Sequence, residues 1–257
     1  MLLGIDHIVI AVANLEAAIK NYERLGFTVV PGGKHPVGTY NGLISLADGS
    51  YIELISFYRD NPQHRWWAPL QKGGGLVDFC MQTDDLVGDT SKLRNAGVRI
   101  DDPVPWSRTR PDGYQLKWLL SLARKGHRGV APFLIQDETP RAERVPRQTI
   151  HKNGASGIGA VIVALNDLPT VKKWYETALG YEGEAVERRD IGATGCIFKV
   201  GPHRLELVAP TAVDSPLNDW LKARGPSPYS ATLLTELRDS DLDNKLTHGA
   251  ALSFQRK

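Results

Sequence analysis

Two polar side chains interrupt apolar segments of the sequence that have the character of buried β-strands. His7 lies in the segment 4–12, and Glu53 lies in the segment 51–55. A buried carboxylate is costly unless it is paired, hydrogen-bonded or bound to a metal, and imidazole is a common metal ligand. One histidine with oxygen donors suits a divalent ion such as Zn, Mn, Fe or Ni. The alternative is a core histidine with satisfied hydrogen bonds and a glutamate paired with a neighbouring arginine.

A second group of polar residues could contact a substrate. His35, Thr39 and Asn41 follow a Gly-Gly turn, where His35 could act as a general base or as a hydrogen-bond donor. It could equally be a loop residue that caps the turn. Arg110 precedes a Pro-Asp-Gly turn and could hold a carboxylate or a phosphate at two points. The alternative for Arg110 is a surface ion pair with Asp112.

Tryptophans could form the wall of a pocket. Trp118 lies in a predicted strand over 115–120, where it could line a pocket or fill the core. Trp66 and Trp67 follow an Asn-Pro pair, and they could form a lid or anchor their segment to the core. The sequence contains no nucleophile elbow, phosphate-binding loop or dinucleotide fingerprint.

The elements that must position these residues come from an internal repeat. Segment 4–15 matches segment 157–168 at a constant separation of 153 residues. Each copy then reaches an acid within an apolar strand, Glu53 in the first and Glu206 in the second. A weaker copy begins at Gly75, 71 residues after the first. Matches at nearly fixed offsets argue against a chance similarity of amphipathic segments.

Each copy predicts a strand, a helix and further strands. Residues 8–12 are mostly β-branched, as in a strand buried on both faces. Asn14 can cap a helix with apolar residues at helical spacing, and Gly26 follows as its stop. A fourth, shorter trace begins at Tyr229. The later strands predicted in the first copy are Phe27–Val30, Gly42–Leu46 and Tyr51–Ser56.

The predicted fold class is α+β, with βαβββ units that pair into curved mixed sheets and carry their helices outside. We expect one full pair and one incomplete pair of units. Residues 1–145 would form a domain from two paired units, at about 4–57 and 75–138. Residues 155–257 would hold a third unit and a truncated fourth unit of the βαβ type.

The ordered motifs over about residues 4–138 resemble the vicinal oxygen chelate superfamily, which includes glyoxalase I, extradiol dioxygenases and fosfomycin-resistance proteins. They are most similar to its glyoxalase-like branch. This superfamily hosts many reactions on one scaffold, so the resemblance does not specify the reaction. The motifs are Gly4–Ile10, Gly32–Pro36 with Gly38, Thr39 and Asn41, Tyr51–Leu54, Thr83–Leu86, Ser107–Gly113 with Trp118, and Pro132–Gln136.

The resemblance implies that two units form a half-open cup that holds a divalent metal. Its ligands would be His7 and Glu53 from the first unit and Asp78 and Gln136 from the second. The branch usually has Glu where Gln136 stands, and a neutral amide is a weaker ligand. The third unit has Ala160 in place of the histidine. The C-terminal half is therefore expected to serve structure, dimerisation or substrate enclosure.

The leading functional hypothesis is a metal-dependent enzyme of the lyase or isomerase type. Its divalent ion would chelate adjacent oxygens of a small substrate and stabilise an enolate-like charge. A dioxygenase would be expected to show two histidines and one carboxylate at its iron. The rival hypothesis is a metal-free protein of the same fold that sequesters a drug or metabolite, and a third is an interaction scaffold with an apolar-filled cup. The catalytic candidates are Glu53 and His35, and the substrate-binding candidates are Thr39, Asn41, Arg110 and Trp118.

Composition and charge argue against three classes of protein: disordered chains, nucleic-acid binders and membrane-spanning proteins. Of 257 residues, 42% are hydrophobic and 23% are charged, which excludes global disorder. The formal charge of +2 and the absence of a convincing basic stripe argue against a nucleic-acid partner, since the basic run 124–128 is typical of a solvated turn. No run approaches the ~20 apolar residues of a membrane span, and the apolar start lacks the basic region of a signal peptide.

Two features suggest the location and assembly of the protein. Cys80 and Cys196 lie far apart within apolar stretches, which suits reduced thiols in the cytoplasm. The incomplete second pair of units leaves strand edges that a second copy could cover in a homodimer.

Overall fold

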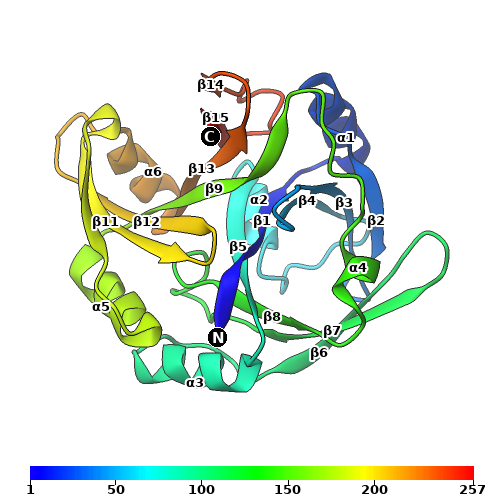
Figure 1. Ribbon diagram of the computed structural model, residues 1–257, viewed down its shortest axis with the longest axis horizontal. Coiled ribbons are helices and arrows are strands. Elements are labelled where there is room, and N and C mark those ends of the chain that lie inside the picture. Colours follow the sequence, from blue (N-terminus) through cyan, green and yellow to red (C-terminus); the bar gives the residue numbers. More distant parts are fainter.

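The computed structural model describes residues 1–257 as two curved mixed sheets with six α-helices around them (Figure 1). This arrangement confirms the predicted α+β fold class. In Figure 1, β2, β3 and β4 lie to the right of β1 and β5, and β11, β12, α5 and α6 lie to the left. None of the helices has both the length and the apolar character needed to span a membrane.

The first sheet closes into a barrel in the strand order β1-β4-β3-β2-β6-β7-β8-β5. β1 and β5 pair along their length on one side, whereas β2 and β6 meet only at Lys34 and Thr109 on the other. The sequence predicts a half-open cup, and this narrow seam is what closes it. The strands are β1 (Leu2–Ala11), β2 (Val30–Lys34), β3 (Thr39–Ser45), β4 (Tyr51–Phe57), β5 (Gly75–Thr83), β6 (Val104–Thr109), β7 (Gln115–Ser121) and β8 (Phe133–Asp137).

Side-chain caps start the two helices that follow β1 and β5. Asn14 accepts a hydrogen bond of 2.8 Å from a main-chain amide of α1 (Leu15–Arg24). Asp85 accepts one of 2.9 Å from an amide of α3 (Leu86–Asn95). Both caps satisfy amides that have no partner inside the helix. The shorter helices are α2 (Trp67–Gln71), between β4 and β5, and α4 (Arg141–Arg144), after β8.

The second sheet is open and has the strand order β10-β11-β12-β9-β13-β15-β14. Its helices are α5 (Leu168–Leu179), the 3₁₀ turn η1 (Arg189–Ile191) and α6 (Pro216–Arg224). Its strands are β9 (Ala155–Ala164), β10 (Glu184–Arg188), β11 (Ala193–Val200), β12 (His203–Pro210), β13 (Ser227–Thr235), β14 (Ser240–Asp241) and β15 (Ala251–Arg256).

The strand pairing reproduces the internal repeat of the sequence. Val9 pairs with Glu53 between the parallel strands β1 and β4, and Ile162 pairs with Glu206 between β9 and β12. Both residues of the second pair lie 153 positions after those of the first. The separation seen in the sequence is therefore also a structural register.

A local two-fold relation connects β1 and β5. His7 lies opposite Cys80, and Val9 lies opposite Asp78. His7 and Asp78 are 71 residues apart, and so are Val9 and Cys80. The two pairs are therefore related by exchange of the two strands. Asp78 is therefore the structural equivalent of His7, as the alignment of the sequence repeats suggests.

The fourth unit differs from the predicted βαβ. Residues 242–250 form turns instead of a helix. β15 pairs with β13 in parallel, as β4 pairs with β1, so β15 takes the place of the last strand of a unit. The fourth unit keeps its first and last strands and loses its helix, and the two-residue β14 pairs with β15.

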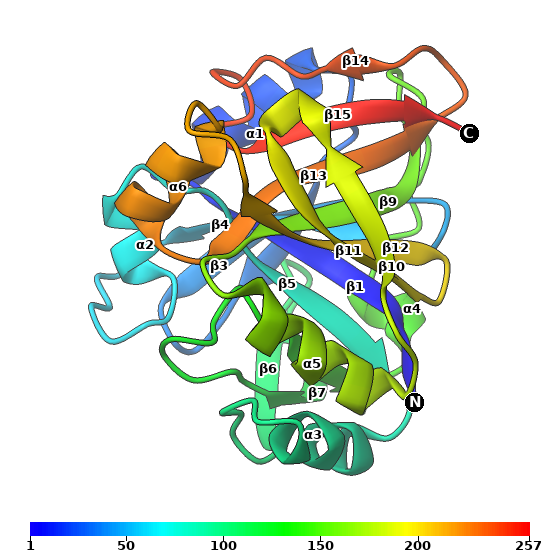
Figure 2. The ribbon, with the colours of Figure 1, turned by 90° about the vertical axis from the view of Figure 1, so that its left-hand side faces the viewer.

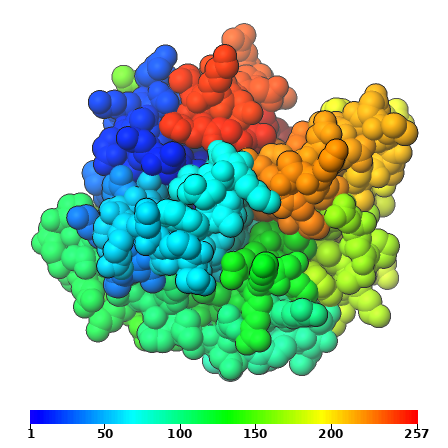
Figure 3. Space-filling model, turned by 180° about the vertical axis from the view of Figure 1, so that it is seen from behind, coloured from blue at the N-terminus to red at the C-terminus, as the bar shows by residue number.

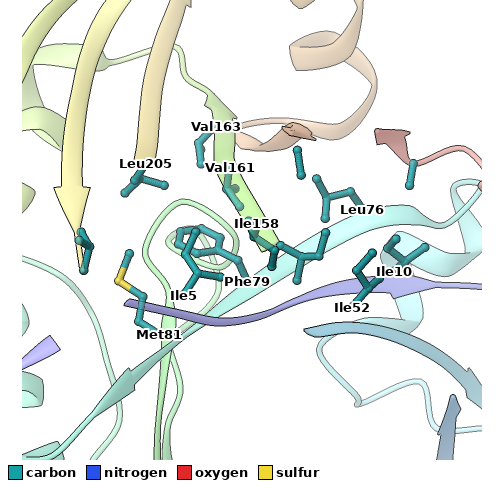
Figure 4. Close-up of a cluster of buried hydrophobic side chains, with 14 of the residues drawn as sticks. Ile5, Ile10, Ile52, Leu76, Phe79, Met81, Ile158, Val161, Val163 and Leu205 are labelled. Carbon is teal, nitrogen blue, oxygen red and sulfur yellow. The ribbon is translucent and has the colours of Figure 1, made fainter. Parts of the chain in front are cut away.

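The two sheets share the largest hydrophobic core. Figure 2 shows β9 and β13 lying across β1 and β5. In Figure 4, Ile5, Phe79 and Met81 from the outer face of β1 and β5 extend toward Ile158 and Val161 of β9. All five side chains are buried. The second sheet therefore covers the outside of the barrel and leaves its inside free for polar residues.

Candidate functional site

A small cavity lies inside the barrel. It has a volume of about 50 Å³, enough for a few water-sized groups. Polar side chains line one part of it, and an apolar cluster that includes Trp118 and Phe133 lines the rest. The residues around the cavity are His7, His35, Thr39, Tyr51, Glu53, Ile55, His64, Arg65, Trp66, Trp106, Arg108, Trp118, Leu120, Leu122, Phe133, Ile135 and Arg144.

His7 and Glu53 meet in this cavity. They project from the adjacent strands β1 and β4, and His7 Nε2 lies 3.5 Å from Glu53 Oε2. The His7 ring stacks on Tyr51, with centroids 4.5 Å apart. Asn41 Nδ2 donates a hydrogen bond of 2.5 Å to the other carboxylate oxygen, Oε1. The prediction that an imidazole and a carboxylate 46 positions apart share one site therefore agrees with the geometry.

A buried ion network fixes the orientation of His7. Asp6 Oδ1 lies 2.6 Å from His7 Nδ1, and the same carboxylate pairs with Arg141 and with Arg144 at 2.9 Å. Arg144 also pairs with Asp137 at 2.5 Å. Burial alone would raise the pKa of Asp6, but Arg144, the hydrogen bond to His7 and Arg141 hold that pKa well below its usual value. An ionised Asp6 accepts the Nδ1 proton of His7, which leaves Nε2 facing Glu53.

Three further residues of the predicted site, His35, Thr39 and Trp118, also line the cavity. Thr39 Oγ1 lies 3.0 Å from His35 Nδ1. The His35 ring stands edge-on to Trp118, with centroids 6.2 Å apart. Burial lowers the pKa of His35 to about 4, so the imidazole is neutral at pH 7. A neutral imidazole can accept or donate a hydrogen bond inside the barrel.

The segment between β4 and β5 reaches into the barrel and engages Asp78. Trp66 Nε1 donates a hydrogen bond of 2.9 Å to Asp78 Oδ2. Arg65 Nη2 lies 2.7 Å from the same oxygen, without the alignment of a hydrogen bond. Trp66 is 9% exposed, so it anchors the segment instead of covering the cavity as a lid. Asp78 is therefore held by Arg65 and Trp66 and does not join the pair of His7 and Glu53.

Gln136 lies outside the cavity, so its prediction as a metal ligand is wrong. Its Oε1 accepts a hydrogen bond of 2.9 Å from the Leu86 amide at the start of α3. Cys80 pairs with Phe133 between β5 and β8, as Val9 pairs with Glu53 between β1 and β4. The structural equivalent of Glu53 is therefore the apolar Phe133.

Arg110 is also absent from the cavity, and its prediction as a substrate contact is wrong. Its guanidinium pairs with Asp112 at 2.5 Å and with Glu143 at 2.8 Å on the surface, as the alternative interpretation expects. Arg108, which is 3% exposed, lines the cavity instead. Arg108 follows Trp106 by two positions in β6, and this alternation was the sequence signal for an inward side chain.

Two buried arginines at the cavity have donors without partners. Arg65 Nη2 forms an ion pair with Asp78, but Nε and Nη1 of Arg65 donate no hydrogen bond, and neither does Nε of Arg108. Arg108 forms no ion pair, and its one hydrogen bond goes to the main-chain oxygen of Arg144 at 2.9 Å. Buried polar groups are nearly always paired, so these donors indicate a missing acceptor.

The family of the chain follows from comparison with known proteins. Residues 5–179 match the family described as the glyoxalase-like domain. The chain belongs to the glyoxalase-like family. The predicted resemblance to the vicinal oxygen chelate superfamily is confirmed. A search of curated proteins found no match to this glyoxalase-like protein.

Two solved structures share the fold of this glyoxalase-like protein. A hypothetical protein from Staphylococcus aureus is 18% identical with a TM-score of 0.73, covering 98% of this chain and 99% of the other. A variant of 4-hydroxymandelate synthase from Streptomyces coelicolor is 16% identical with a TM-score of 0.61, covering 91% and 72%. At these identities the likeness shows the fold alone.

The donor set of this glyoxalase-like protein does not fit a divalent ion. A catalytic site of this kind usually has three protein ligands, but only His7 and Glu53 face each other here. Asp78 is engaged by Arg65, and the fourth position holds Phe133. The ligand atoms of Asp6, His7 and Cys80 lie within 4.8 Å of one another, but Asp6 is already saturated by arginines, and burial raises the pKa of the Cys80 thiol well above its usual value.

The second sheet carries the relic of a similar site. Glu206, the equivalent of Glu53, pairs with Arg188 at 2.7 Å. The equivalent of His7 is Ala160, and Ser230 lies across β9 from Ile162. These residues offer one carboxylate and no imidazole, as expected from the sequence.

Proposed function

We propose that the barrel interior is the active site of a small-molecule enzyme of the isomerase or lyase type, which transfers a proton on an anionic substrate. The observation that carries this proposal is the buried guanidinium of Arg108, which has no carboxylate partner and an Nε without a hydrogen bond, beside Glu53 and His7. A carboxylate or an enolate is the acceptor best suited to a buried guanidinium, because it accepts hydrogen bonds and balances the positive charge.

Glu53 is the residue that moves the proton. Its Oε1 is held by Asn41, and its Oε2 faces the cavity and His7 Nε2. Glu53 removes a proton from the carbon beside a carbonyl or carboxylate, and the electron pair of the C–H bond moves into an enolate. His7 can take the proton from Glu53 because Asp6 holds its Nδ1–H.

The arginines would hold the negative charge that develops on the substrate. Burial lowers the pKa of the Arg108 guanidinium, and the nearby Glu53 carboxylate opposes this shift only in part. Charge-assisted hydrogen bonds inside a dry cavity stabilise a developing oxyanion more than they would in water. The proton then returns to another face or carbon in an isomerase, or a leaving group departs in a lyase.

The rival function, sequestration of an apolar molecule, has less support. Although Trp118, Trp106 and Phe133 line the cavity, its volume of about 50 Å³ is small for a drug-sized ligand. The buried guanidinium of Arg108, which has no carboxylate partner, also favours a charged ligand over an apolar one.

Binding of oxalate tests the anion site, because oxalate is a small planar dianion with adjacent oxygens. We expect oxalate to bind by isothermal titration calorimetry, and Arg108→Met to weaken binding at least tenfold, about 1.4 kcal/mol. Arg110→Met is the matched control, since Arg110 lies on the surface. Equal weakening in both variants, or none in Arg108→Met, would contradict the proposal.

Hydrogen exchange on pyruvate tests proton transfer. In D₂O the protein should accelerate loss of the pyruvate methyl signal at least tenfold over buffer, measured by proton NMR. Glu53→Gln should return the rate to that of buffer, whereas Glu206→Gln, at the equivalent position of the second sheet, should not. Stoichiometric metal in the purified protein that is lost in both His7→Ala and Glu53→Gln would instead favour the metal-dependent enzyme.

A further inference from the structure

A second concave region lies where the barrel meets the second sheet. It is a cleft of about 270 Å³. Four segments line it: the connector 65–72, residues 76–78 of β5, the loop 125–128, and residues 224–227 from the end of α6 to the start of β13. Figure 3 shows the connector, the loop and the last of these segments, in cyan, green and orange, meeting on one face of the molecule.

The cleft has a strong positive charge. Its lining contains Arg65, Lys72, Lys125, Arg128 and Arg224, and only one carboxylate. Of these five cationic side chains only Arg65 forms an ion pair, and its partner is that carboxylate. Two residues of the basic run, Lys125 and Arg128, line the cleft from the exposed turn that the sequence predicts. Because no other carboxylates neutralise these charges, the cleft attracts anions.

Arg65 has hydrogen-bonding capacity that the protein does not use. Its side chain is 7% exposed, and the ion pair of Nη2 with Asp78 Oδ2 at 2.7 Å leaves Nε and Nη1 without a hydrogen-bond partner. It lines both the cleft and the barrel cavity, together with Trp66. A guanidinium buried to this degree requires acceptors.

The shape of the cleft favours a small molecule over a polymer. Apolar residues also line the cleft beside the cations, among them Trp66, Pro69, Leu76 and Val77. Arg224 is already fixed, since it donates a hydrogen bond of 2.6 Å to the Gly74 oxygen and packs on Trp220. Concave sites with an apolar wall and a few convergent polar groups are typical of small ligands, whereas nucleic acids are bound along extended basic patches or stripes.

We propose that this cleft is a binding site for the phosphate group of a small phosphorylated molecule. Phosphate suits the site because several cationic groups from separate segments can each contact one of its oxygens. The site goes beyond the proton-transfer activity proposed for the barrel, and either can exist without the other. Arg65 and Trp66 form the wall between them.

Calorimetric titration with inorganic pyrophosphate at 150 mM NaCl tests this site. We expect a dissociation constant below 1 mM, and Lys125→Ser and Arg128→Ser to weaken binding at least fivefold each. Both residues are exposed, so these variants should fold. The matched control is Arg124→Ser, because Arg124 pairs with Asp101 and lies outside the cleft. Glycerol 3-phosphate, titrated in parallel, distinguishes a phosphate ester from free inorganic phosphate as the ligand.

The outcomes separate this site from the barrel site. Oxalate binding should be unchanged in Lys125→Ser and Arg128→Ser, and pyrophosphate binding should be unchanged in Arg108→Met. No saturable binding of either phosphate compound would overturn the proposal. So would equal weakening by Arg124→Ser, or tighter binding of a single-stranded oligonucleotide than of pyrophosphate.

Discussion

At the scale of single residues, surroundings decide what equivalent side chains can do. Glu53 and Glu206 occupy the same position in two copies of one unit. Glu53 faces a histidine and a cavity, whereas Glu206 is neutralised by Arg188. The acid in the strand is therefore a property of the repeat, and its chemistry depends on the neighbours that each copy supplies.

The buried histidine His35 makes stability depend on pH. Burial lowers its pKa from 6.5 to about 4, so the unfolded chain binds the proton more tightly than the folded one. Stability is therefore lost as the pH falls from 6.5 towards 4. Between pH 7.5 and pH 5.0 the loss from His35 should be about 2 kcal/mol, and His35→Gln should remove it. Urea unfolding of both proteins at the two pH values measures it.

His64 does not obscure this result. Burial lowers its pKa to about 4 as well, so the wild type and His35→Gln should both retain a dependence from His64. Only the difference between them reports on His35. The same pH dependence in both proteins would contradict the prediction, because it would mean that folding does not change the pKa of His35.

At the scale of elements, the repeat made most of the first barrel predictable. Fixed separations of 153 and 71 residues give the register of β1, β4, β5 and β9, because paired strands cannot slip without exposing their apolar face. The sequence separation between β4 and β8, the last strands of the first two units, does not follow from the repeat, because the loops within each unit vary in length. For this reason the sequence indicates Gln136 as the equivalent of Glu53, whereas Phe133 holds that position in the structure.

The contributions of loops could not be predicted. Arg65 and Trp66 lie between two units, where no periodicity indicates which way a side chain points. Their effect on Asp78 depends on tertiary packing of the connector. The sequence therefore predicted the pair His7 and Glu53 but not the guanidinium that replaces a third ligand.

The seam between β2 and β6 should be the most easily disrupted part of the barrel. A Cβ on Gly33 would lie 2.0 Å from the Thr109 main-chain oxygen, and its φ of +134° is unfavourable for other residues. Gly33→Ala should therefore push β2 away from β6 and destabilise the protein by more than the ~1 kcal/mol of left-handed strain alone. Gly49→Ala provides that reference, since Gly49 has a φ of +87° and nothing within 4 Å.

Hydrogen exchange followed by mass spectrometry locates the effect. Peptides from β2 and β6 should exchange faster in Gly33→Ala than in the wild type, while peptides from β1 and β5 should change little. The two substitutions could instead lower the free energy of unfolding by the same amount. This result would mean that β2 and β6 accommodate the Gly33→Ala side chain without separating.

At the scale of the whole molecule, the two sheets differ in what they leave open. The barrel has no free edges, but the second sheet ends at β10 and β14. Pairing of two copies through these edges stays a prediction, as does the division into two domains. Cys80 and Cys196 are free and buried, and burial raises the pKa of the Cys196 thiol to about 11, so both are poor nucleophiles near pH 7.

The shared core should make the two sheets unfold as one unit. Ile158 of β9 is fully buried against the outer face of β1 and β5. Ile158→Ala should lower the free energy of unfolding by about 2–5 kcal/mol. Because the neighbours of Ile158 belong to both sheets, amides of both sheets should become less protected from hydrogen exchange. Exchange of peptides from β5 and β12 should therefore accelerate together. Acceleration confined to β12, with β5 unchanged, would show that the barrel is stable without the sheet that covers it, and the two halves would then be separable domains.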